Sequence, residues 1–181
     1  MSWQQEAEQL CRAVLGPELA GMPIYVLGNA EVPEWLRAVE SCGFTGDWLD
    51  AALAETLGAR WQGRGFCCVI SDSRNGRPAS PREKVCTALH ELGHHLESLA
   101  LGSRILTRTV EELAPLVSPL PSPIDAGPPR VPRAAWHGHA RGFIRACGHV
   151  AHRASLAGFP ATLSDVGAAG RLYGLSEPAA Y

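Results

Sequence analysis

Apolar residues recur at three- and four-residue spacing near both ends of this chain, and this pattern predicts two amphipathic helices. The first is expected over residues 3–15, ending at the Gly16-Pro17 pair. The second is expected over about 134–157, where the pattern resumes after a long interruption. Apolar positions 163, 166, 172 and 173 predict a further short helix in the tail.

Two short apolar runs, residues 22–27 and 66–71, predict buried strands because they are rich in β-branched and aromatic residues and are bounded by glycines or turn residues. A helix is expected to start at Pro33, with Trp35, Leu36 and Val39 on its apolar side, and another to cover about 47–58. Helices and strands in this order predict an α+β fold with a small sheet.

The segment Ser80-Pro81-Arg82-Glu83 has the form of a capping box with proline at the first helical position. It predicts a helix over 81–101, which Gly102 ends. Residues 115–133 contain seven prolines and have almost no periodicity, so we expect an extended insertion there. A length of 181 residues predicts a single domain over 1–181 that carries this insertion.

Composition narrows the class of protein. Apolar residues make up 46% and charged residues 19%, as in a folded globular chain, and the net charge of −2 gives no general reason to bind nucleic acid or an anionic membrane. No signal peptide or membrane-spanning run is visible, so we expect a cytoplasmic protein with no membrane partner. The six cysteines form no CxxC pair and are expected to be free and mostly buried.

Residues His90-Glu91-Leu92-Gly93-His94 form an HExxH pattern inside the predicted helix 81–101. Side chains four residues apart lie one turn apart on the same face, so His90 and His94 can reach one Zn²⁺ ion. Glu91 projects beside them, where it can take a proton from a water on the metal and pass it to a leaving amine. Gly93 is expected to keep the backbone thin where substrate approaches, and His95 to face solvent or make a supporting hydrogen bond.

A catalytic zinc site normally has three protein ligands and leaves one position for water, so a third ligand must come from outside this motif. Two kinds of downstream residue are candidates. Glu111 and Glu112 would provide a carboxylate, and His137 or His139 an imidazole. The two histidines would lie about 200° apart on one helix, so both cannot face the metal.

HExxH combined with His137-Gly138-His139 and with Phe143, four residues after His139, resembles the SprT-like zinc metallopeptidases, which include the Spartan-type proteases. The resemblance covers about a dozen positions. It implies a compact zincin-like fold, with His90, His94 and His139 as zinc ligands and Glu91 as the general base. A protein or peptide substrate is implied as well, and nucleic acid is a partner only through this resemblance.

We therefore expect a zinc-dependent metallopeptidase. The alternatives are a zinc-binding regulatory or interaction module with little or no turnover, and a zincin with Glu111 or Glu112 as an acidic third ligand. If strand 66–71 forms a sheet edge, an extended peptide could pair with it and present its carbonyl to the zinc. Tyr25 or an arginine of the second long helix is a candidate for holding the oxyanion.

Overall fold

The computed structural model describes residues 1–16, 19, 21–38, 42–44, 50–74, 76–100 and 141–166, and its architecture is mixed α+β, as the sequence predicts. By its internal contacts the chain forms two compact units, Met1–Leu92 and Gly93–Tyr181. The boundary falls inside helix α3 (Pro81–Ala100), which is continuous. The single domain over 1–181 stays a prediction.

Helix α1 (Trp3–Leu15) begins at a capping box and ends at Gly16, so the predicted bounds are confirmed. The Ser2 hydroxyl accepts a hydrogen bond from the Gln5 amide at 3.3 Å, and the Gln5 side chain accepts one from the Ser2 amide at 3.0 Å. Gly16 has a φ of 74°, which glycine adopts without the clash that a Cβ would cause. The predicted apolar stripe of this helix is buried.

Three of the described strands of the first unit form a sheet in the order β1 (Ile24–Gly28), β3 (Phe66–Ile70) and β2 (Cys42–Phe44). β1 and β3 are parallel, with Ile24 opposite Phe66, and β2 is antiparallel to β3. Both predicted strands are confirmed. The expectation of an edge at 66–71 is wrong because β3 is the central strand, a position that suits its wholly apolar, doubly buried sequence.

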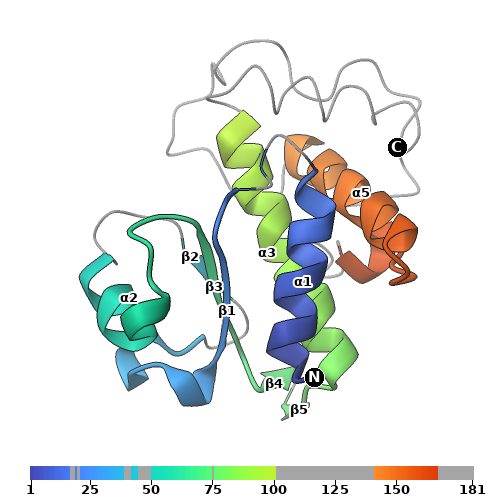
Figure 1. Cartoon of the computed structure of the whole chain (residues 1–181). Helices are drawn as coiled ribbons and strands as arrows, with labels where there is room; N and C mark the ends of the chain where they lie inside the picture. Colours follow the sequence, from blue (N-terminus) through green and yellow to red (C-terminus); the bar gives the residue numbers. More distant parts are fainter. Residues whose placement is uncertain are drawn as a thin grey trace. The chain divides into compact units, whose positions relative to one another are not determined.

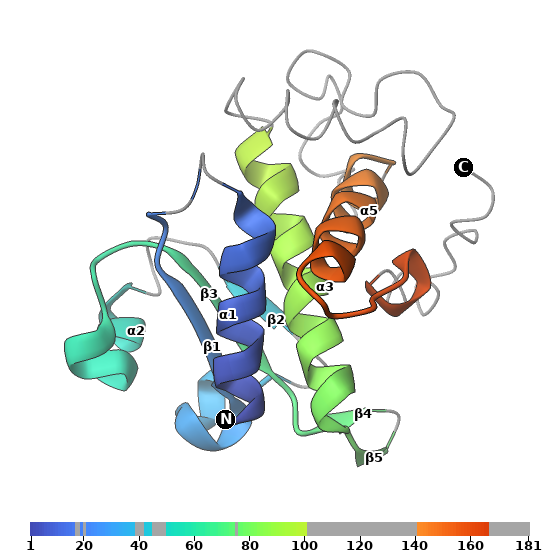
Figure 2. The ribbon, with the colours of Figure 1, turned by 45° about the vertical axis from the view of Figure 1, so that its right-hand side comes forward.

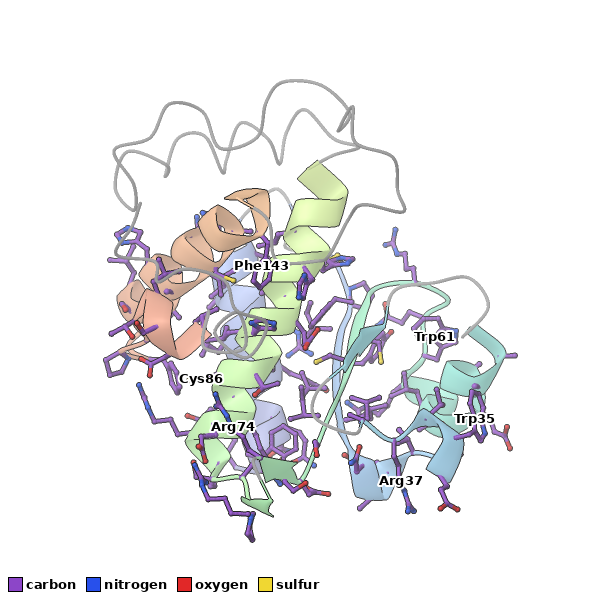
Figure 3. All side chains as sticks on the ribbon, turned by 180° about the vertical axis from the view of Figure 1, so that it is seen from behind. Trp35, Arg37, Trp61, Arg74, Cys86 and Phe143 are labelled. Atoms are coloured by element: carbon purple, nitrogen blue, oxygen red, sulfur yellow. The ribbon has the colours of Figure 1, made fainter. Side chains whose placement is uncertain are left out.

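The two faces of this sheet bury different side chains because successive strand residues point in opposite directions. Tyr25 and Cys67 face α2 (Asp50–Leu57), in a core that also contains Leu27, Val32, Leu36, Ala38, Leu57 and Val69. The Trp61 ring packs on Tyr25 with 5.3 Å between centroids, on the side of the sheet where Figure 3 also shows Trp35. α1 and the first turns of α3 cover the opposite face (Figure 1).

The helix expected from Pro33 is wrong in extent: the structure has only the 3-10 helix η3 (Glu34–Leu36). Asn29 explains the early end, because its side-chain amide donates to the Ala38 carbonyl and accepts from the Ala38 amide, both at 2.8 Å. These bonds take the backbone groups that a longer helix would need. Leu36 is buried as expected and Trp35 is exposed, while Val39 lies outside the described residues.

The helix expected over 47–58 is confirmed from Asp50 to Leu57 as α2, while residues 47–49 lie outside the described part. The 3-10 helix η5 (Gly58–Arg60) follows it. Strands β4 (Ser73–Arg74) and β5 (Arg77–Pro78) form a small hairpin that leads into α3. The predicted capping box is present, since the Glu83 amide donates to Ser80 Oγ at 3.2 Å and the Ser80 amide donates to the Glu83 carboxylate at 2.9 Å. The Arg77 guanidinium also pairs with Glu83 and holds the pKa of that carboxyl well below its usual range.

In the second unit, α5 (Arg141–Leu156) lies beside the C-terminal part of α3 (Figure 2). The helix predicted over 134–157 is confirmed from residue 141 onward, and residues 134–140 lie outside the described part. A helical turn at 163–166 confirms part of the predicted tail helix, with Thr162 and Asp165 capping its start. The proline-rich segment 115–133 is also outside the described residues.

The five cysteines whose side chains the structure describes are free and buried, as expected: Cys11, Cys67, Cys68, Cys86 and Cys147. Burial raises the pKa of the Cys11 and Cys67 thiols to about 12. Such thiols carry little thiolate at neutral pH and act as small apolar side chains. None of the described helices combines the length and the apolar character that crossing a membrane requires.

Candidate metal centre

The HExxH residues lie in the interior of α3, and the first two of them are buried. His90 is 4% exposed and Glu91 is 6% exposed. Because α3 is one continuous helix, His90 and His94 stand one turn apart on the same side of it. The apolar side chains Val85, Leu89, Leu92 and Leu96 of the same helix are buried as well. His90 and Glu91 are therefore shielded from bulk water together with the packing face of the helix, whereas His94 is half-buried.

Glu91 lies close enough to the sheet for its charge to act on the thiol of Cys68, in the central strand β3. Burial raises the pKa of Cys68 well above its ordinary value, and the charges of Cys11 and Glu91 add to the rise. Since Cys68 points away from the face that holds Cys67, Glu91 is on the α1 and α3 side of the sheet.

Tyr25 belongs to the other side of the sheet. It is buried in the core with Cys67, and its hydroxyl accepts a hydrogen bond from the Gln62 amide at 3.0 Å. The expectation that Tyr25 holds an oxyanion near Glu91 is therefore wrong. Alternation along two paired strands separates the two side chains, and the sheet itself lies between them.

Phe143, the aromatic residue of the second sequence motif, stacks on His94, the last residue of the first. The ring centroids are 4.0 Å apart and the planes are inclined by 19°. Phe143 comes from the first turn of α5 and is fully buried, and Figure 3 shows it against α3. The stack restricts the orientation of the His94 imidazole.

Gly93 admits α5 to the backbone of α3 beside this stack. A Cβ at position 93 would meet Cys147 Sγ at 3.0 Å and Phe143 Cε2 at 3.4 Å. The expectation that Gly93 clears space for substrate is therefore wrong. The missing side chain provides the close approach of two helices instead, which is a packing role.

The candidates for a third ligand, His139, His137, Glu111 and Glu112, lie outside the described residues. Within the described part of the chain, no group of three His, Cys, Asp or Glu side chains is arranged to hold a metal ion. The donor chemistry at α3 fits Zn²⁺, because two imidazoles one helical turn apart are a common pair of zinc ligands. Completion of the site by His139 stays a prediction.

Two other histidines are shielded from water to different degrees. His95 is partly buried, which lowers its pKa to about 4, so it does not face open solvent, and the supporting hydrogen bond expected for it stays a prediction. His149, in α5, is 2% exposed, and its Nδ1 atom has no hydrogen-bond partner in the described part of the chain. Burial lowers its pKa to about 4 as well, with smaller contributions from Arg153 and His152.

The sequence pattern does not identify Cys68 as a neighbour of Glu91. The available signal was the Cys67-Cys68 pair within a strand, because strand alternation sends two adjacent thiols to opposite faces. Which face meets the helix is set by tertiary packing, and that information is absent from the local pattern. The contact between Phe143 and His94 could not be predicted from the sequence either, although both residues belong to the two motifs.

No match to this chain was found among protein-family models, curated proteins or solved structures. The resemblance to SprT-like metallopeptidases therefore stays a prediction that rests on the two motifs. Of the residues that carry it, the described part of the chain contains the whole HExxH pattern and Phe143.

Proposed function

We propose that this chain is a zinc-dependent metallopeptidase with a zincin-like, SprT-like active site. The observation that carries the proposal is the stack of Phe143 on His94. It joins two short motifs that are far apart in the sequence, and an HExxH pattern that arose by chance in a helix would not predict this contact. The α+β order, with the motif helix against a small sheet, supports the same assignment.

In this proposal, His90 and His94 hold the metal through their imidazoles, and His139 is the third ligand. When bound, zinc polarises the scissile carbonyl and makes a water molecule more acidic. Glu91 takes a proton from the attacking water and returns it to the leaving amine nitrogen. The burial of Glu91 keeps this carboxylate in a water-poor setting, where its interactions with the reacting groups are strong.

The substrate in this proposal is an extended protein or peptide segment. It cannot pair with β3, because that strand has neighbours on both sides. On the outer side of β1, the amides of Val26 and Gly28 already donate to the carboxylates of Glu8 and Glu31. A substrate strand would therefore have to pair elsewhere than at β3 or at the outer side of β1. Nucleic-acid association and cytoplasmic location stay predictions.

The first test compares wild type with Glu91→Gln for hydrolysis of an unstructured protein and for zinc per chain by elemental analysis. We expect about one zinc in both proteins, with turnover lower by about 10²–10⁴-fold in the variant because its general base is lost. Glu55→Gln, an exposed carboxylate on α2, is the matched control and should leave turnover unchanged.

Each contrary outcome has a definite meaning. Unchanged turnover in Glu91→Gln removes this residue from the mechanism. Zinc in the wild type without hydrolysis favours the regulatory or interaction module, and a wild type without zinc makes HExxH a coincidence on a structural helix. In a parallel His139→Ala sample, retained zinc moves the third ligand to His137, Glu111 or Glu112.

A further inference from the structure

β1 is an outer strand of the described sheet, with β3 on one side of it. The Phe66 amide of β3 donates to the Pro23 carbonyl at 2.9 Å, and pairing then continues through Tyr25 and Leu27. The backbone groups of the alternate residues Ile24, Val26 and Gly28 therefore point away from β3. A row of backbone donors and acceptors on an outer strand is normally a template for pairing with another chain.

Side chains bond outward backbone groups at both ends and in the middle of this strand. The Val26 amide donates to Glu8 Oε1 at 3.2 Å, and the Gly28 amide donates to Glu31 Oε2 at 2.7 Å. The Ile24 carbonyl accepts from Arg12 Nη2 at 3.4 Å. Each of the three outward residues of β1 thus has one backbone group held by a side chain.

These side chains are themselves held in place. Gln4 Nε2 donates to Glu31 Oε2 at 3.1 Å, and Arg12 pairs with Glu8 at 3.2 Å. Arg60, from η5, adds a second ion pair to Glu8 at 2.6 Å. The Glu8 side chain is only 12% exposed, so water screens these interactions less than on an open surface.

The sequence spacing explains the arrangement. Gln4, Glu8 and Arg12 are four residues apart, so they form one polar row along α1 beside its buried apolar stripe. In Figures 1 and 2, α1 runs alongside β1. The helix therefore packs on the sheet with one row of side chains while another row reaches the strand edge.

We infer that Gln4, Glu8, Arg12 and Glu31 form an edge clip that occupies the outer side of β1 in place of a fourth strand and prevents β1 from pairing with β1 of a second copy. The strand Ile24–Gly28 contains no charge and no proline, which are the usual protections of an outer strand. The protection comes from α1, η5 and the turn after the strand instead. This inference does not depend on peptidase activity.

Amide hydrogen exchange followed by NMR tests the clip residue by residue. In the wild type, we expect slow exchange at Val26 and Gly28 although neither amide faces a strand. In Glu8→Ala, exchange at Val26 should rise roughly tenfold or more, because the lost acceptor is charged. The Leu27 amide, which faces β3, should keep its rate, and the exposed Glu6→Ala variant of α1 should change neither amide.

Sedimentation velocity over a range of protein concentrations tests the consequence for association. We expect self-association to be stronger in Glu8→Ala than in wild type or Glu6→Ala. Glu8→Gln retains an acceptor oxygen but loses the ion pairs with Arg12 and Arg60, so its Val26 amide should remain protected. If Glu8→Ala does not fold, the exchange rates of Glu8→Gln and of the wild type test the clip instead.

Two results would overturn the inference. One is a wild-type Val26 amide that exchanges as fast as an amide in open solvent, because Glu8 would then form no lasting hydrogen bond with it. The other is a Glu8→Ala protein with a fast Val26 amide and unchanged association, because an open β1 edge would then not be the hazard that the clip prevents.

Discussion

The buried imidazole of His149 makes the stability of this chain sensitive to acid. Burial lowers the pKa of His149 to about 4 in the folded state, whereas the ordinary value of 6.5 applies to the unfolded chain. Below pH 6.5 the unfolded chain binds a proton that the folded chain refuses, so stability is lost as the pH falls from 6.5 toward 4. Between pH 7 and pH 5, we expect the free energy of unfolding in urea to fall by roughly 2 kcal/mol through this residue.

Variants isolate the contribution of His149 from that of every other titrating group. His149→Leu should remove that part of the acid sensitivity, because the new side chain cannot bind the proton. Leu156→Ala, at an exposed position of the same helix that does not titrate, is the control and should keep the wild-type slope. An equal fall in wild type and His149→Leu would show that other groups cause the acid sensitivity.

The burial of His149 could not be predicted from the sequence, and the reason is geometric. The apolar stripe of α5 contains Phe143, Cys147, Val150 and Ala154, and residue 149 lies about 100° around the helix from Val150. Periodicity alone therefore places it toward the surface. The relative positions of His90 and His94 could be predicted, because a four-residue spacing places both side chains on one side of any helix that contains them.

Between elements, Gly93 sets how closely α5 approaches α3. In an open helix, Gly→Ala stabilises by about 1 kcal/mol, but here the new Cβ would meet Cys147 Sγ at 3.0 Å, and overpacking costs about 1–3 kcal/mol. We expect the clash to dominate, so that Gly93→Ala lowers the free energy of unfolding by about 1 kcal/mol in urea titration.

The double variant Gly93→Ala/Cys147→Ala tests the cause. Removing Sγ makes room for the new methyl group, so the double variant should lose less stability than the sum of the two single variants. Strictly additive losses would show that Cys147 is not what Gly93 accommodates. A Gly93→Ala protein more stable than wild type would show that helix propensity outweighs packing at this position.

Elements whose ends are marked by neighbouring residues in the sequence were predicted well. The way in which these elements pair with one another was not. The capping boxes at Ser2 and Ser80 determine where α1 and α3 begin, since they satisfy backbone groups through neighbours in sequence. The central place of β3 depends on β1 and β2 together. The early end of η3 depends on a pair of bonds between Asn29 and Ala38, nine residues apart. Local patterns do not contain such contacts.

At the scale of the whole molecule, the proposed zinc ion joins helix α3 to a residue 45 positions after His94 in the sequence. An ion that binds only the folded chain stabilises it by about 4 kcal/mol at a concentration a thousandfold above its dissociation constant. For a chain of this length, we expect chelation of zinc to lower the melting temperature of the wild type by roughly 10 °C.

Thermal unfolding of His139→Ala then tests the proposed third ligand without any assay of hydrolysis. If His139 holds the ion, the variant should melt at about the temperature of the chelated wild type, and chelation should lower it no further, because both changes remove the same binding free energy. His152→Ala should retain the full response to chelation. A His139→Ala protein that responds like the wild type would place the third ligand elsewhere, and the same cycle applied to His137→Ala, Glu111→Gln and Glu112→Gln would then identify it by the response that disappears.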